Sequence, residues 1–401
     1  MTNVSERLNE IKQWFMDESL NGQGAVKTGE RLCQMLREFG VPITRAHVLV
    51  MFLHPLYHGR SIIWSEKEGI REENWRHGLQ DQPGWTANVF HALIKGSAPD
   101  RMHFDLRDPS AGEDFPMMQE LRTEGVTNYV AFRFRFSDGS THAASFATDA
   151  AGGFSEDDQE LLFGLERLIA VRLENVIRRE LSYTILGAYL GRNAAEHVLA
   201  GRIRREDMET ISAAVWMSDL RGFTALSDRL PGEALLELLG DYFTVVVEAV
   251  RAEGGEVLKF IGDAVLAIFR VQDGGPAEAC EAAVRAARAV DAEIKKLNEQ
   301  REQQGKAQIH QGIGLHMGEV NYGNVGSPDR LDFTVIGPAV NMASRIEALC
   351  SGLNQTVLMS ELFAQQVRAS TVCLGSQNLK GVVASVNVYG LLPLAKNGAP
   401  T

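Results

Sequence analysis

Two aspartates, Asp219 and Asp263, occupy positions where a chain could hold metal ions. The apolar run 211–217 predicts a buried strand that ends just before Asp219, and a helix is predicted over 224–230. A carboxylate is a hard oxygen ligand of the kind that Mg²⁺ prefers. Gly222 lets the backbone approach a ligand closely, and the amides that open the next helix can meet phosphate oxygens. This segment therefore indicates metal and phosphate binding, although an ordinary helix cap gives a similar sequence.

The second aspartate lies in a very short turn. Apolar runs on both sides of Gly262-Asp263 predict two strands joined at these residues. In isolation the segment is typical of a plain hairpin turn. Its acid matters because a two-metal site needs two carboxylates that converge from neighbouring strands.

A third segment places an amide and a guanidinium on one helical face. Residues 332–336 predict a strand that turns at Gly337-Pro338 into a helix. Asn341 and Arg345 are four residues apart on that helix, so they lie one turn apart on the same face. Such a pair could hold a sugar and a transferring phosphoryl group together. The alternative is an exposed helix with an ordinary arginine.

Together the three segments resemble the catalytic domain of class III nucleotidyl cyclases, over roughly residues 207–393. The patterns Asp-x-x-Gly-Phe-Thr, Lys-x-x-Gly-Asp and Val-Asn-x-Ala-x-Arg rarely occur together by chance. The resemblance implies a ferredoxin-like α/β core and a head-to-tail homodimer. Met217 and Pro338 depart from the family's usual residues, and neither is expected to contact the reacting atoms.

The resemblance also implies a role for each matching residue. Asp219 and Asp263, with the carbonyl of Leu220, would coordinate two Mg²⁺ or Mn²⁺ ions per active site. Asn341 and Arg345 would act on the transition state. The other side chains and amides expected to bind substrate are Phe223, Thr224, Lys259, Thr334 and Lys380. The dimer geometry of the family implies that the partner chain supplies Lys259, Thr334, Asn341, Arg345 and Lys380.

The base-selecting pair, Lys259 and Thr334, favours ATP. Adenine offers an acceptor at N1 and a donor at its 6-amino group, which match a lysine donor and a threonine hydroxyl acceptor. Guanine reverses these polarities, and guanylate cyclases carry glutamate where Lys259 stands. We therefore expect an adenylate cyclase; a guanylate cyclase and a catalytically silent nucleotide-binding dimer are the alternatives. Thr334 also resembles a subgroup that includes bicarbonate-responsive enzymes, so bicarbonate stimulation is a hypothesis.

Residues 1–156 predict a small α/β module. An amphipathic helix is expected over 25–39, a buried strand over 47–53, and a hairpin with one buried face over 128–147. Residues 125–131, the hairpin and residues 153–162 resemble the last strands and helix of a GAF domain. This resemblance implies a sensor or dimerisation domain that could bind a small molecule. Some other α/β dimerisation domain is the alternative.

A helical connector is expected over 157–206. Ser155 is a candidate helix cap, and a stripe of apolar residues follows at helical spacing to about residue 179. A second helical stretch is expected over 181–203. The stripe fits either a core-facing helix or a two-stranded coiled coil between protomers. The organisation expected from the sequence is thus a GAF-like domain (1–156), the connector, a cyclase domain (207–395) and a flexible tail (396–401), in the α+β or α/β class.

The bulk properties are those of a cytoplasmic protein. The 401 residues carry a formal net charge of −12, which disfavours non-specific binding to nucleic acid or to an anionic membrane. The four cysteines are widely spaced and are expected to be reduced. No run of about 20 apolar residues appears, so no membrane span is expected.

Overall fold

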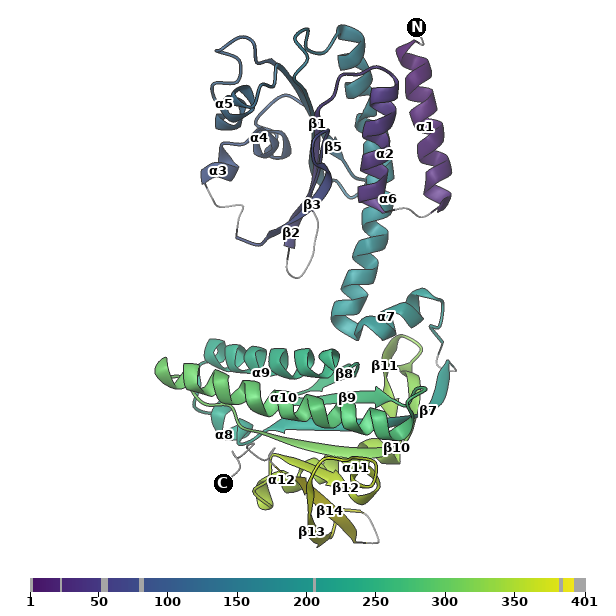
Figure 1. Cartoon of the computed structure of the whole chain (residues 1–401), viewed down its shortest axis with the longest axis vertical. Helices are drawn as coiled ribbons and strands as arrows, with labels where there is room; N and C mark the ends of the chain where they lie inside the picture. Colours follow the sequence, from purple (N-terminus) through teal and green to yellow (C-terminus); the bar gives the residue numbers. More distant parts are fainter. Residues whose placement is uncertain are drawn as a thin grey trace, which may run out of the picture. The chain divides into compact units, whose positions relative to one another are not determined.

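The computed structural model describes residues 3–21, 24–51, 57–78, 83–204, 207–381 and 385–392. The chain divides into two compact units, Met1–Ile185 and Leu186–Thr401 (Figure 1). The tail predicted at 396–401 lies outside the described residues, as does the end of the predicted catalytic domain beyond 392. Over the described ranges, no helix has the length and apolarity needed to cross a bilayer.

The first unit is built on a six-stranded antiparallel sheet. The strand order is β3-β2-β1-β6-β5-β4. These strands are β1 (Arg45–Met51), β2 (Tyr57–Ser65), β3 (Gly69–Arg76), β4 (Arg101–Asp105), β5 (Asn128–Arg135) and β6 (Thr141–Thr148).

Helices cover both faces of this sheet (Figure 1). One face is covered by α2 (Ala25–Glu38) and α6 (Glu156–Leu190), and α1 (Val4–Asn21) adds apolar side chains to the same core. The other packs against α4 (Val89–Lys95) and α5 (Pro116–Thr123), with the short α3 (Pro83–Thr86) nearby. The predicted hairpin is confirmed as β5–β6, but the expectation of one buried face was wrong. Both of its faces are buried because the two strands lie inside a sheet sandwiched between helices.

The helical connector differs from its prediction. The Ser155 cap is confirmed, since Ser155 Oγ accepts from the amide of Asp158 at 3.2 Å and the Asp158 carboxylate accepts from the amide of Ser155 at 3.0 Å. However, α6 runs unbroken to Leu190. It ends at Gly191, whose φ of +89° a glycine adopts readily, and α7 (Arg192–Leu199) follows. The apolar stripe of α6 is buried in the core of its own unit: Leu162, Leu165, Ile169, Leu173 and Val176.

The second unit contains a mixed eight-stranded sheet. Its order is β13-β14-β12-β10-β7-β9-β8, and β11 pairs with the long β10. Among the strand pairs of the described residues, β10–β12 is parallel and the others are antiparallel. The strands are β7 (Met208–Leu220), β8 (Glu256–Ile261), β9 (Ala264–Arg270), β10 (Gln311–Ser327), β11 (Arg330–Ile336), β12 (Val357–Ser360), β13 (Thr371–Gln377) and β14 (Val386–Leu391).

Two long helices, α9 (Gly232–Ala252) and α10 (Gly275–Gln303), cover one face of this sheet. The other face packs against α7 and α11 (Pro338–Glu347). The described part of this unit also contains three short helices: α8 (Phe223–Ser227), α12 (Leu349–Gly352) and α13 (Glu361–Ala364). The strand pairs and helix predicted around the candidate site are confirmed as β7, β8–β9, and β11–α11.

Candidate active site

The two aspartates come together at neighbouring strand ends. Asp219 is the penultimate residue of β7, and Asp263 lies in the turn between β8 and β9, where Gly262 takes a φ of +66°. Strand β9 pairs directly with β7, which carries the two carboxyl groups into hydrogen-bonding contact. The amide of Leu220 donates to Asp219 Oδ1 at 3.0 Å.

The electrostatics of this pair favour a bound cation. Burial raises the pKa of Asp219 to about 7, and contact with Asp263 and the charge of Glu347 add to the shift. Burial also raises the pKa of Glu347 to about 7, against the opposing charge of Arg221. Two acids that share a site disfavour each other's ionisation, and a divalent cation removes that repulsion.

The donor set fits Mg²⁺ or Mn²⁺ together with a phosphate ligand. Mg²⁺ is usually bound by one or two protein carboxylates plus substrate phosphates. Asp219 and Asp263 supply two carboxylates, and the backbone of Leu220 lies beside them. Among the described residues, no group of three or more His, Cys, Asp or Glu side chains is arranged to hold a metal ion.

Glycines of β10 let the helix that carries Asn341 and Arg345 lie close to the sheet. A Cβ atom at Gly314 would overlap the carbonyl oxygen of Ala343 on α11. At Gly318 it would come within 2.9 Å of Ala339 Cβ. The close approach holds α11 firmly over β10 and β7. Asn341 is exposed on this helix, and Arg345 is half-buried one turn later.

Lys259 and Thr334 lie on strands that the structure brings together. Lys259 on β8 forms an ion pair with Asp332 on β11, two residues before Thr334. Thr334 itself is buried. Asp332 is not among the site residues predicted from the sequence. Its position two residues before Thr334, hence on the same face of a strand, was the available signal.

The other residues predicted to bind substrate are Lys380, Phe223 and Thr224. Lys380 is exposed in the turn after β13, and a Cβ on the adjacent Gly381 would lie 3.5 Å from Arg345 Nη2. Phe223 and Thr224 open α8, next to the aspartate pair in sequence. Within the described residues, no hydrogen bond or ion pair joins Asp219 or Asp263 to Lys259, Thr334, Asn341, Arg345 or Lys380.

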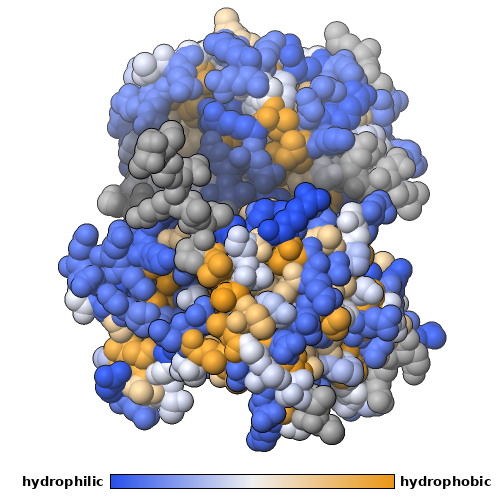
Figure 2. Space-filling view, turned by 60° about the horizontal axis from the view of Figure 1, so that its bottom comes forward, coloured by the Kyte–Doolittle hydropathy of each residue, from blue (hydrophilic) through white to orange (hydrophobic). Residues whose placement is uncertain are grey.

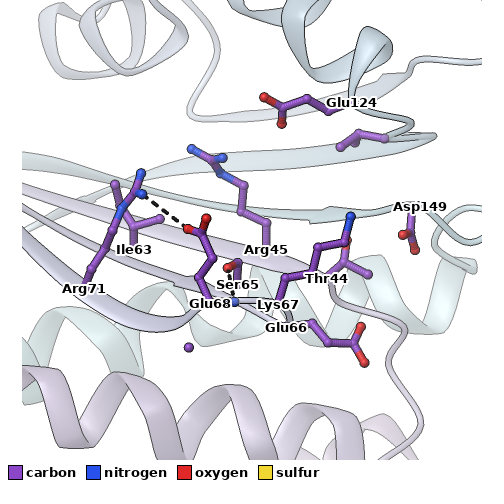
Figure 3. Close-up of a pocket in the computed structure, with 12 residues that line it drawn as sticks. Thr44, Arg45, Ile63, Ser65, Glu66, Lys67, Glu68, Arg71, Glu124 and Asp149 are labelled. Atoms are coloured by element: carbon purple, nitrogen blue, oxygen red, sulfur yellow. Dashed lines mark hydrogen bonds and ion pairs between the residues drawn. The ribbon is translucent and has the colours of Figure 1, made fainter.

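A separate cavity of about 590 Å³ lies in the first unit, at one end of β1, β2 and β3 (Figure 3). Its lining is strongly charged. Arg71 pairs with Glu68 at 3.4 Å, and Glu66 is bound by Arg37 from α2. Arg45 projects between these groups in the close-up.

The geometry of the second unit agrees with its sequence relationships. The family described as the adenylate and guanylate cyclase catalytic domain matches residues 205–391. Residues 205–391 form a class III nucleotidyl cyclase catalytic domain. The aspartate pair, the Lys259–Asp332 ion pair between β8 and β11, and α11 all lie in this cyclase domain.

The relatives include proteins named adenylate cyclase. One from Anabaena cylindrica is 36% identical over 176 residues, which cover 43% of this chain and 33% of the relative. Adenylate cyclase 1 of Rhizobium meliloti is 28% identical over 181 residues, covering 45% of this chain and 27% of that protein. The chain thus spans about a third or less of the length of these relatives. Among solved structures, the adenylyl cyclase CyaB from P. aeruginosa is 28% identical with a TM-score of 0.44, covering 48% of this chain and 99% of that one.

Proposed function

We propose that this chain is an adenylate cyclase that converts ATP to 3′,5′-cyclic AMP and pyrophosphate. The observation that carries the proposal is the direct contact between the carboxyl groups of Asp219 and Asp263 inside a nucleotidyl cyclase domain. A half-buried acid pair of this kind is stable in its ionised form only with a cation, and a nucleoside triphosphate brings the remaining ligands for that cation.

ATP is preferred to GTP because of the residue at position 259. A lysine facing the N1–H of guanine would leave two donors opposed, at a cost of about 1–3 kcal/mol for each unsatisfied buried group. Lysine donates to adenine N1 instead, and the Thr334 hydroxyl can accept from the 6-amino group. The relatives named adenylate cyclase support the same choice.

The reaction is an in-line attack of the ribose 3′-hydroxyl on the α-phosphorus, with pyrophosphate leaving. Asp219, Asp263 and the Leu220 carbonyl would hold two Mg²⁺ or Mn²⁺ ions, which when bound lower the pKa of the 3′-hydroxyl and neutralise phosphate charge. Arg345 would stabilise charge on the α-phosphoryl oxygens, and Asn341 would orient the ribose. The other phosphate contacts would come from Lys380 and the amides of Phe223 and Thr224.

A homodimer is needed for this assignment, with the base-selecting and transition-state residues supplied by the partner chain. Large apolar side chains stay exposed on β8 and its surroundings: Phe260 and Ile261 are 48% and 49% exposed. Phe260 also stacks on Phe243, with ring centroids 4.3 Å apart. Figure 2 shows hydrophobic side chains gathered on the surface of this unit. Exposed apolar patches mark interaction sites, and a second copy is the partner proposed for this one.

The first unit is proposed to be a GAF-like regulatory domain that binds a small molecule. Its support is the antiparallel six-stranded sheet with helices on both faces and the charged cavity of Figure 3. The proposed organisation remains a regulatory domain over 1–156, a connector over 157–206 and a ferredoxin-like catalytic domain over 207–395.

The test is a product assay on the purified full chain. ATP and GTP are supplied separately with Mn²⁺ or Mg²⁺, and the products are separated by chromatography. We expect cyclic AMP from ATP and no product from Asp263→Ala. Cyclic GMP as the main product would establish a guanylate cyclase. Nucleotide binding without any cyclic product would establish a silent signalling dimer.

A further inference from the structure

Glu256 is a buried carboxylate to which the proposed chemistry gives no role. It opens β8 and is 8% exposed. Asn193 Nδ2 donates to it at 3.0 Å, and the Tyr322 hydroxyl lies 3.1 Å from both of its oxygens. Burial raises the pKa of Glu256, while these two hydrogen bonds and the charge of Arg270 oppose the shift. A buried acid is retained only with such donors, so its partners fix where β8 begins.

A β-bulge gives Glu256 a direct geometric relation to Lys259. The pairing of β8 with β9 shifts between Val257 and Lys259, so one extra residue is accommodated there. Glu256 lies opposite Ile268, and Lys259 lies opposite Leu266. Since the opposing residues are two apart, Glu256 and Lys259 are on the same face of the sheet although they are three apart in sequence.

The donor Asn193 belongs to α7, which packs tightly on this face. Ala194 and Ala195 on α7 are fully buried. His197 lies edge-on to Tyr322 and to Phe333, with ring centroids 5.8 Å and 5.5 Å apart. Phe333 directly precedes Thr334.

The chain segments before and after α7 also contact strands of this sheet, β8 and β10. A Cβ at Gly191 would lie 3.3 Å from the carbonyl oxygen of Val257, so the turn before α7 runs beside the β8 backbone. After α7, Asn324 on β10 donates from Nδ2 to the carbonyls of Arg202 and Arg204, each at 3.1 Å. Together with the His197–Phe333 contact, the segment 191–204 therefore contacts β8, which carries Lys259, and β11, which carries Thr334.

We propose that Glu256 is a positioning residue for base recognition, and that α7, through Asn193, sets where Lys259 meets the base. The inference rests on the proposed adenylate cyclase function. When Asn193 moves away, the Glu256 carboxylate loses a charge-assisted hydrogen bond, and the start of β8 shifts to recover a donor. The bulge carries that shift to Lys259. Because α7 follows α6 directly in the chain, a displacement of the α6 end reaches base recognition by this route.

The experiment compares Asn193→Ala with a matched control in the full chain. Asn298→Ala likewise removes an asparagine from a helix, in this case α10. Asn298 Nδ2 donates to the carbonyl oxygen of Ile309 at 2.8 Å, and its Oδ1 accepts from the Ile309 amide at 2.7 Å. We expect Asn193→Ala to raise the KM for ATP and to lower the ATP-to-GTP ratio of kcat/KM by about tenfold, with kcat changed less than about threefold. Asn298→Ala should keep the wild-type ratio.

Glu256→Gln and Tyr322→Phe test the same proposal if Asn193→Ala fails to fold. Glutamine keeps the shape and one acceptor, so Glu256→Gln should fold and show a smaller change of the ratio in the same direction. Tyr322→Phe removes the second donor and should do likewise. Unchanged ATP-to-GTP ratios in the variants that fold would overturn the proposal. If the wild type forms no cyclic nucleotide, the proposed function fails. The inference about Glu256 is then tested by binding: the ratio of mant-ATP to mant-GTP affinity should fall in the same variants, and an unchanged ratio would overturn it.

Discussion

Asp219 lies in contact with Asp263 and within the electrostatic influence of Glu347. Its pKa of about 7 reflects burial first and then the nearby Asp263 and Glu347. In the folded chain without metal, this carboxyl therefore keeps its proton at pH values where an unfolded chain, with a pKa of about 3.9, has lost it. The resulting contribution to stability is complete below about pH 4 and is lost as the pH rises through about 7. Glu347 adds an effect of the same sign.

We predict that the melting temperature of metal-free protein falls between about pH 5 and pH 8, in part through Asp219. Asp219→Asn should flatten this slope, because an amide does not ionise. Mn²⁺ should restore stability above about pH 7, since only the ionised pair binds the cation. Thermal unfolding in chelator across that pH range measures the effect, with the exposed Asp228→Asn as a control. An Asp219→Asn slope equal to that of the wild type would contradict the assignment.

Arg345 is expected to act on the transition state more than on substrate binding. Arg345→Ala should lower kcat by about 100-fold or more while KM changes less than about threefold. Arg285→Ala is the control, because Arg285 is an exposed arginine on α10 paired with Glu253 at 2.6 Å. Steady-state kinetics with ATP and Mn²⁺ separate the two constants. A rise in KM at constant kcat would instead make Arg345 a substrate-binding residue.

At the residue scale, the sequence predicted the contacts that depend on local patterns. Asp219 and Asp263 were expected to converge because each stands at a strand end, and the structure confirms their contact. Asp332 and Glu256 were missed. Their partners, Lys259 and Asn193, are 73 and 63 residues away, and only the strand order brings them together.

At the level of elements, the position of α11 against the sheet depends on two glycines of β10, Gly314 and Gly318. We predict that Gly314→Ala destabilises the protein by about 1–3 kcal/mol and lowers activity, because its methyl group would push α11 away from the sheet. Gly240→Ala on α9, where a Cβ meets nothing within 4 Å, should be neutral or slightly stabilising. Melting temperature and turnover of the two variants are compared. An equally stable and active Gly314→Ala would show that the close packing of α11 is not required.

Local patterns were less informative where tertiary packing decides the outcome. The amphipathic stretch at residues 25–39 is confirmed as α2 because its apolar face is sufficient to predict a helix. The break in the connector was placed near residue 180, but the helix continues to Leu190. Only Gly191 interrupts it. The second buried face of the β5–β6 hairpin was missed because it is covered by α4, a distant element.

At the scale of the whole molecule, the proposed active site forms only when two chains associate. Each protomer contributes the aspartate pair to one proposed site and Arg345 with Lys259 to the other. The contacts of α7 would then connect the sequence leading out of the first unit to the strands that read the base. Pairing of two copies was expected from the family resemblance and not from residues 256–261 themselves, because the apolar residues exposed on β8 also fit an ordinary strand.

The most direct test of this shared site is complementation between two inactive variants. Asp219→Ala and Arg345→Ala are purified, shown to be inactive alone, mixed in equal amounts under conditions that exchange subunits, and assayed for cyclic AMP. Random pairing makes half of the dimers mixed, each with one intact site, so activity should return to about a quarter of the wild-type value. No recovery after demonstrated subunit exchange would contradict an active site built from two chains.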